Sequence, residues 1–170
     1  MEVNEEIIEQ YLKLKKFFYI HDIKFKVWGN KGGSNYSNID FLALNDQGNF
    51  YDIEVKFRSK YKLTFGSKAS EEWIVNLAEQ LTRKERNEEI KKYSNKKPIK
   101  VIISTHICFG KKSEKRKAIE DKVRAKVKGY DLEFWYFEDI IQLLRKETGP
   151  HGRYDSPILQ MIRLLNTSGQ

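Results

Sequence analysis

The sequence predicts an α/β protein in which helices flank a central mixed β-sheet, and three observations carry that prediction. Helical and strand-like segments alternate along the chain, which is typical of a sheet covered by helices. Two neighbouring strand segments, residues 39–44 and 50–57, are joined by a short turn, and such a hairpin makes the sheet mixed. The 170 residues are 39% hydrophobic, which suffices for the core of one domain over residues 1–170.

The first elements are a helix, a strand and a loop. Hydrophobic residues as far as Phe18 recur at helical spacing, which predicts a helix over residues 4–20. Residues 23–27 alternate strictly between apolar and polar side chains, as a half-buried strand does. Glycines then indicate a loop at residues 31–35, before the hairpin.

The second half of the chain predicts helices interleaved with two buried strands. Residues 70–93 form one long helical segment, and the β-branched run at residues 100–103 predicts a strand, with an extension to Ile107 left open. The remaining elements are a very basic helix, a strand and two helices, at residues 112–127, 132–137, 138–146 and 157–165. The expected order is therefore α-β-β-β-α-β-α-β-α-α.

Charge and composition narrow the classes of function. Thirty-two Lys and Arg residues against 24 Asp and Glu give a net charge of +8, and a pI near 9.4 is typical of domains that bind nucleic acid. A single cysteine, Cys108, excludes a disulfide framework within the chain and a Cys-rich zinc site. The longest apolar runs are too short to cross a bilayer, and no signal peptide is visible. We therefore expect a cytoplasmic protein without a membrane partner.

One group of charged residues stands out on the predicted hairpin. The period of two places Phe50, Asp52, Glu54 and Lys56 on one face of the third strand, and Tyr51, Ile53, Val55 and Phe57 on the other. The second set predicts a core face. Asp40 lies near the start of the neighbouring strand, so the hairpin can bring Asp40 alongside Glu54. Two carboxylates and one ammonium would then meet at one end of the sheet.

This grouping has two interpretations. Magnesium takes oxygen ligands and commonly only one or two protein carboxylates, and a lysine nearby can stabilise charge that develops on a phosphate. The alternative is a salt-bridged solvent face of a hairpin, which contributes little to stability. An acid two residues before a lysine also occurs at 22–24, 89–91 and 120–122. Among these, only Glu54 and Lys56 lie on an alternating strand whose partner strand carries an acid.

At these residues the sequence resembles the PD-(D/E)XK nuclease superfamily, and within it the archaeal Holliday junction resolvases and related restriction-type nucleases. The matching features are an acidic first helix, the Gly-Gly-Ser loop at 32–34, Ile39 with Asp40, and the run from Glu54 to Arg58. They span roughly residues 5–107. Ile39 replaces the family's proline before the first acid. The resemblance implies a restriction-endonuclease-like fold with an αβββαβ core and an α-β-α-α extension.

The resemblance also implies roles for individual residues. Asp40 and Glu54 would bind Mg²⁺, for which Mn²⁺ would substitute, and Lys56 would position the attacking water. Glu5 is preferred among the glutamates of the first helix because it shares a flank with that helix's hydrophobic residues. An interaction of Glu5 with the helix dipole would explain it equally well. Gln80 resembles the helix glutamine that assists the site in exonuclease-type members, and a plain polar helix position is its alternative.

Basic residues supply candidates for contact with nucleic acid. Resolvases lay a loop on DNA that resembles the segment containing Lys31 and Ser34, although a simple strand connection is the alternative. The remaining candidates follow the third strand or lie on the basic helix, where phosphate contacts explain the charge excess better than a solvated surface does: Arg58, Lys60, Lys115, Arg116 and Lys122.

The sequence therefore predicts a metal-dependent DNA endonuclease acting on duplex or branched DNA, and it leaves open whether the enzyme prefers a DNA structure such as a Holliday junction. The alternatives are a nucleic-acid-binding protein that keeps the fold without cleaving, and an exonuclease or RNase of the same superfamily. Association with the nucleoid follows from DNA as the partner. A homodimer stays open, because symmetric cutting of two strands favours one and the sequence reveals no interface.

Overall fold

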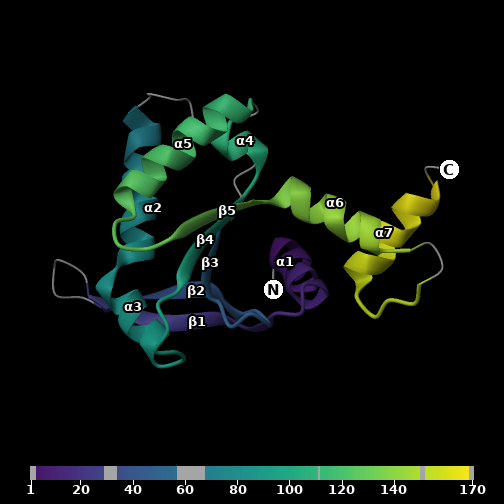
Figure 1. The fold of residues 1–170 in the computed structure, drawn as a ribbon, viewed down its shortest axis with the longest axis horizontal. Coiled ribbons are helices and arrows are strands. Elements are labelled where there is room, and N and C mark those ends of the chain that lie inside the picture. The colour runs from purple at the N-terminus through teal and green to yellow at the C-terminus, as the bar shows by residue number, and fades with distance from the viewer. Residues whose placement is uncertain (1–2, 29–33, 57–67, 111, 150–151, 169–170) are drawn as a thin grey trace.

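The computed structural model of the chain describes residues 3–28, 34–56, 68–110, 112–149 and 152–168. Its elements follow one another as α1 (Val3–Leu14), β1 (Phe18–Trp28), β2 (Ser34–Leu44), β3 (Phe50–Lys56), α2 (Lys68–Thr82), α3 (Lys84–Lys91), β4 (Ile99–Ser104), α4 (His106–Phe109), α5 (Ser113–Lys126), β5 (Leu132–Tyr136), α6 (Phe137–Glu147) and α7 (Pro157–Ser168). Figure 1 shows their arrangement around one sheet. Among the described helices, none has both the length and the apolar character needed to cross a membrane.

The five strands lie side by side in the order in which they occur along the chain. β1, β2 and β3 pair antiparallel, whereas β4 and β5 continue the sheet in parallel. The prediction of an α/β protein with a mixed sheet is therefore confirmed. The parallel pairs need crossovers, and α2 with α3 and α4 with α5 provide them.

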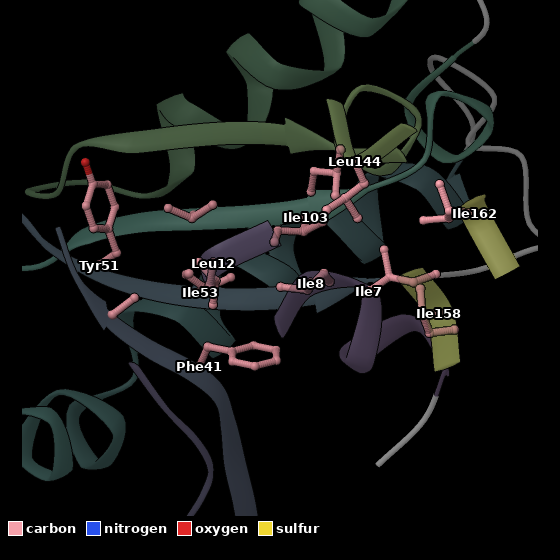
Figure 2. Close-up of a cluster of buried hydrophobic side chains, with 13 residues drawn as sticks. Ile7, Ile8, Leu12, Phe41, Tyr51, Ile53, Ile103, Leu144, Ile158 and Ile162 are labelled. Carbon is pink, nitrogen blue, oxygen red and sulfur yellow. The ribbon is translucent and has the colours of Figure 1, made fainter. Parts of the chain in front are cut away.

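Helices cover both faces of the sheet. α1, α6 and α7 pack on one face through a hydrophobic cluster that includes Ile8 and Leu12 of α1 and Ile53 of β3 (Figure 2). α2, α4 and α5 pack on the other face, where Leu81 and Phe109 join Ile102 of β4. Strand alternation explains this division, because Val101 and Ile103 contribute to the first cluster and Ile102 contributes to the second.

The first helix is shorter than its hydrophobic pattern predicts. α1 ends at Leu14, and Lys16 adopts the left-handed region with a φ of 58°, which turns the chain into β1. Phe18, predicted on the core side of a helix, instead lies on β1 and is 76% exposed. Phe17 takes the core position, with its ring centroid 5.4 Å from that of Tyr51. The prediction of a helix over residues 4–20 is therefore wrong in its last turns.

The long helix predicted over residues 70–93 is two helices. Arg83 between them has extended backbone angles, φ −54° and ψ 136°. The Asn87 side-chain amide donates to the carbonyl oxygens of Thr82 and Arg83, at 3.0 and 2.9 Å. The Arg83 carbonyl also accepts from the Asn87 backbone N–H at 3.1 Å, as the first bond of α3, so the side-chain amide chiefly serves the Thr82 carbonyl at the end of α2. The break redirects α3 so that it can reach the sheet.

The strand predicted at residues 100–103 is confirmed, but the open extension to Ile107 is not. β4 stops at Ser104, and Thr105 begins the short helix α4 by accepting a hydrogen bond from the Cys108 backbone N–H at 3.3 Å. A threonine at this position commonly begins a helix. Ile107 consequently lies on a helix and is 40% exposed.

Candidate functional site

The candidate site lies where β2 and β3 separate. Their ladder ends with the pair Phe41 and Ile53, although β3 continues to Lys56. Beyond that pair, the Val55 backbone N–H donates to Oδ2 of Asp40 at 2.6 Å. The Asp40 carboxylate thus replaces a strand carbonyl as the acceptor. β2 begins at Ser34, inside the predicted loop, so Asp40 lies in the middle of its strand and the prediction that it lies near the start is wrong.

Glu54 is held by side chains from three elements. Its Oε1 accepts from Nε2 of Gln80 on α2 at 2.9 Å and lies 2.5 Å from Nζ of Lys56. Its Oε2 pairs with Nη1 of Arg86 on α3 at 2.7 Å. Glu54 is only 2% exposed, so these contacts replace water and fix the orientation of its carboxylate.

Asp52 forms a second buried network beside Glu54. The guanidinium of Arg86 donates to both Asp52 oxygens, from Nη2 at 2.6 Å and from Nε at 3.0 Å. Nζ of Lys100 lies 2.7 Å from Oδ2 of Asp52 and 2.7 Å from Oδ1 of Asn87. Asp52, Arg86 and Lys100 are all 0% exposed. Arg86 therefore bridges Asp52 and Glu54.

Sequence reasoning assigned no role to Asp52, Arg86 or Lys100. Two signals for them were available. Asp52 shares the strand face of Glu54. Lys100 is a charged residue near the start of an otherwise apolar strand, and it pairs in register with Asp52. No local signal distinguishes Arg86 from the other basic residues of its helix.

The interpretation of this strand face as solvent-exposed is wrong. Asp52 and Glu54 are buried together with Phe50, Tyr51 and Ile53, because α2 and α3 cover the side that carries the carboxylates. The ions are paired, but in the interior. A buried pair contributes little net stability while it is intact, yet it becomes costly when one partner is removed.

The surroundings of Asp40 and Asp52 shift the pKa values of these two aspartates in opposite directions. Burial and the neighbouring Glu54 charge raise the pKa of Asp40 to about 7, against the opposing effects of the Val55 N–H, Lys56 and Arg86. Burial alone would also raise the pKa of Asp52, but Arg86 and Lys100 bring it below the ordinary value. Burial lowers the pKa of Lys100. Of the two aspartates, Asp40 is therefore the one whose charge the surroundings disfavour.

The remaining predicted site residues belong to α1, to the basic helix α5 and to segments that the structure describes only in part or not at all. Glu5 lies on α1, which packs on the opposite sheet face from α2 and α3. Lys31, Arg58 and Lys60 lie outside the described residues, and for Ser34 only the backbone is described.

The basic helix α5 packs against α2. Its Lys115 is exposed. Arg116 donates to the Gly110 carbonyl at 3.2 Å and lies 5.5 Å from the Tyr136 ring centroid. Lys122 pairs with Glu71 of α2. Arg116 and Lys122 thus have structural partners, whereas Lys115 projects into solvent.

The donor set at the site fits magnesium. Two carboxylates, Asp40 and Glu54, match the one or two that Mg²⁺ commonly takes alongside water. A bound cation would offset the burial and the Glu54 charge that together raise the pKa of Asp40. The described part of the chain holds no group of three His, Cys, Asp or Glu side chains arranged for a metal. A zinc site with three or four protein ligands therefore does not fit these residues.

Compared with protein-family models, with curated proteins and with solved structures, the chain shows no match. The resemblance to the PD-(D/E)XK superfamily, the restriction-endonuclease-like fold and the site assignments therefore stay predictions that rest on this chain's own residues.

Proposed function

We propose that the protein is a magnesium-dependent nuclease of the PD-(D/E)XK type, which hydrolyses phosphodiester bonds in DNA. The observation that carries the proposal is the meeting of Asp40, Glu54 and Lys56 at the point where β2 and β3 separate. The net charge of +8 favours a polyanionic substrate.

In this proposal, Asp40 and Glu54 hold the metal. When bound, Mg²⁺ supplies a water of lowered pKa and neutralises charge that develops on the phosphate. Gln80 and Arg86 fix the Glu54 carboxylate through their hydrogen bonds, in the way that outer residues commonly orient metal ligands. The Lys56 side chain is 23% exposed, so its ammonium can reach an incoming phosphate while it stays next to Glu54.

Lys56 has the geometry of a group that stabilises charge in the transition state. Its ammonium is fixed near Glu54 before substrate arrives, so little reorganisation is needed when negative charge develops. Removing such a donor typically costs about 10²–10³ in rate. We expect a loss of that size for Lys56→Ala, with metal binding retained.

One observation favours a second candidate, a nucleic-acid-binding protein that does not cleave. Both oxygens of Glu54 already face cations, Lys56 on one side and Arg86 on the other. Three carboxylates, those of Asp40, Asp52 and Glu54, are thus matched by three basic side chains without any metal. In this reading, the network only stabilises the fold beneath a basic surface.

A cleavage assay separates the two candidates. Labelled four-way junction, linear duplex, single-stranded DNA and RNA are incubated with Mg²⁺, with Mn²⁺ and with excess chelator. We expect wild-type cleavage of DNA only with a metal, and a loss of at least about a hundredfold for Asp40→Asn. Lys84→Ala is the matched control, because the Lys84 side chain is 85% exposed and pairs only with Glu88 among the described residues.

Full metal-dependent cleavage by Asp40→Asn, or activity in excess chelator, would overturn the assignment. Binding of DNA without cleavage of any substrate would favour the second candidate. Cleavage confined to RNA or to DNA ends would support the assignment of the site but show that the proposed substrate is wrong. A preference for the junction over the duplex would support structure-specific cutting, and sedimentation of the active protein would decide whether it is a homodimer.

A further inference from the structure

The hairpin of β1 and β2 continues beyond the point where β2 leaves β3. Residues 23–28 of β1 pair with residues 34–39 of β2, whereas the described pairing of β2 with β3 stops at Phe41. This two-stranded ribbon lies at the α3 end of the sheet, away from α1 (Figure 1). One of its faces is packed, because Ile23, Phe25 and Ile39 join Ile90 of α3 in a hydrophobic cluster.

The opposite face of the ribbon is open. It carries Lys24, Lys26 and Trp28 from β1 and Tyr36 and Asn38 from β2, which together we call the ribbon face; all five are exposed. Trp28 is 64% and Tyr36 is 74% exposed. Folding a β-strand does not require large aromatic side chains to point into water, and exposed apolar groups next to one another commonly mark a binding surface.

The lysines of the ribbon face lie next to its aromatic residues. Lys26 lies opposite Tyr36 in the strand register, and its Nζ lies 4.6 Å from the Trp28 ring centroid. The five side chains include two ammonium groups and no carboxylate. The face therefore combines flat aromatic surface with positive charge, which is how proteins bind single-stranded nucleic acid. A docking face for an apolar protein segment would be more continuously apolar, whereas three of these five side chains are polar or charged.

The ribbon face leads to the candidate site. Tyr36, Asn38 and Asp40 alternate along β2, and Nδ2 of Asn38 lies 3.4 Å from Oδ1 of Asp40. Tyr36 is four residues from Asp40, which is about 14 Å along a strand. Stacked nucleotides advance by about 3.4 Å each along one strand. A base resting on Tyr36 would therefore lie about four stacked nucleotides from a phosphate at Asp40.

We infer that the ribbon face binds an unpaired segment of the nucleic acid, with bases stacked on Trp28 and Tyr36 and phosphates next to Lys24 and Lys26. The inference rests on the proposed function for the position of the cut, and it names the substrate class as DNA with a single-stranded segment beside the scissile bond. In an intact duplex the base faces are already stacked on one another, so the two rings would have nothing to cover.

The test measures binding in excess chelator, where no cleavage is expected. Fluorescence anisotropy follows labelled oligothymidylate and a blunt duplex of the same length. The double variant with Trp28→Ala and Tyr36→Ala should lose at least about tenfold in affinity for oligothymidylate, and less than about twofold for the duplex. Tyr36→Phe, which keeps the ring, should bind as the wild type does.

Tyr93→Ala is the matched control, because Tyr93 is an exposed aromatic residue, 49% accessible, outside the ribbon face. It should leave both affinities unchanged. Tryptophan emission gives a second readout. Trp73 and Trp135 pack against the hydrophobic clusters, so quenching by oligothymidylate should disappear with Trp28→Ala alone.

Unchanged oligothymidylate affinity in a double variant that melts at the wild-type temperature would overturn the inference. An equal loss for the duplex would overturn it too, because the face would then only attract phosphate. Failure of the proposed function looks different. If Asp40→Asn still cleaves while the ribbon variants lose oligothymidylate, the nuclease site is wrong and the ribbon face stands. If Asp40→Asn is inactive but the ribbon variants bind normally, the reverse holds.

Discussion

Asp52 and Asp40 lie on neighbouring strands, and their surroundings shift the pKa of the carboxyl group in opposite directions. Asp52 receives Arg86 through both oxygens and Lys100 through one. Asp40 receives the Val55 backbone N–H and the Asn38 side-chain amide, and it is partly buried beside the charge of Glu54. The pKa of Asp52 is therefore below its ordinary value, whereas that of Asp40 is raised to about 7.

The difference separates a carboxylate that stabilises the fold from one that is available for chemistry. Burial disfavours the charge of both residues, but only Asp52 has enough cations to compensate. A group whose charge is left disfavoured beside a second carboxylate can gain from a bound cation, and such groups concentrate at functional sites. Arg86 is the residue that divides the two environments, because it pairs with Asp52 and Glu54 and has no described bond to Asp40.

The largest effect is expected at Arg86. Arg86→Met keeps much of the side-chain volume but leaves Asp52 and Glu54 buried without their shared cation. Removing one partner of a buried ion pair typically costs about 3–5 kcal/mol. Urea denaturation should show a loss of that size, while Lys84→Met on the exposed side of the same helix changes stability by less than about 0.5 kcal/mol. A loss below about 1 kcal/mol for Arg86→Met would show that the network is not structural.

Replacing each aspartate by asparagine tests the comparison directly. Asp52→Asn leaves Arg86 and Lys100 without a carboxylate, and should lower the free energy of unfolding by about 3 kcal/mol. Asp40→Asn keeps the acceptor for the Val55 N–H and removes a charge that burial and Glu54 disfavour, so at pH 7.5 the variant should not be destabilised and should gain about 2 kcal/mol. The free energies of unfolding come from denaturant titrations at pH 7.5 without metal. Similar losses for both variants would remove the distinction.

The two aspartates also give opposite pH dependence. Asp40 has a folded-state pKa of about 7 against an ordinary value near 4, so between these values the folded protein binds more protons than the unfolded chain. Stability should therefore fall as pH rises from 5 to 7, by about 2 kcal/mol. Asp52, with its lowered pKa, gives stability that is present above about pH 4 and lost at lower pH.

Denaturation of the wild type and of Asp40→Asn at intervals of pH checks the sign. The difference between them should change between pH 5 and 7 and then level off. At pH 8, added Mg²⁺ should raise the melting temperature of the wild type and not that of Asp40→Asn. The same profile in both proteins would assign the titration to another group.

The smallest effect is expected at Gln80. Gln80→Ala removes one of the three groups that hold Glu54 and leaves Lys56 and Arg86 in place. We expect a loss of about 1 kcal/mol in stability and a decrease in cleavage of no more than about tenfold. Glu79→Ala, at an exposed neighbouring position, should change neither quantity. A loss of activity as large as that of Asp40→Asn would make Gln80 part of the reaction itself.

The local parts of this site follow from the amino-acid sequence alone. A period of two is a property of any strand, so the alternation along residues 50–56 placed Asp52, Glu54 and Lys56 on one face and the core residues on the other. The short turn then made β2 the partner of β3, which brought Asp40 to Glu54. These relations involve residues close in sequence, and propensity and spacing suffice to predict them.

Contacts between distant parts of the chain fix which charges are buried and which residues pair with them. Arg86 reaches Asp52 across 34 positions of the chain, and Lys100 reaches it across 48. The break at Arg83, which directs α3 to the sheet, has no strong local signal. The hydrophobic pattern likewise gave no sign of the end of the first helix, so it placed Phe18 on that helix, whereas Phe18 is exposed on β1. Burying a charge costs free energy unless a partner compensates it. That partner is supplied by a distant part of the chain, so the environment of each carboxylate is fixed only when the sheet and its helices are packed together.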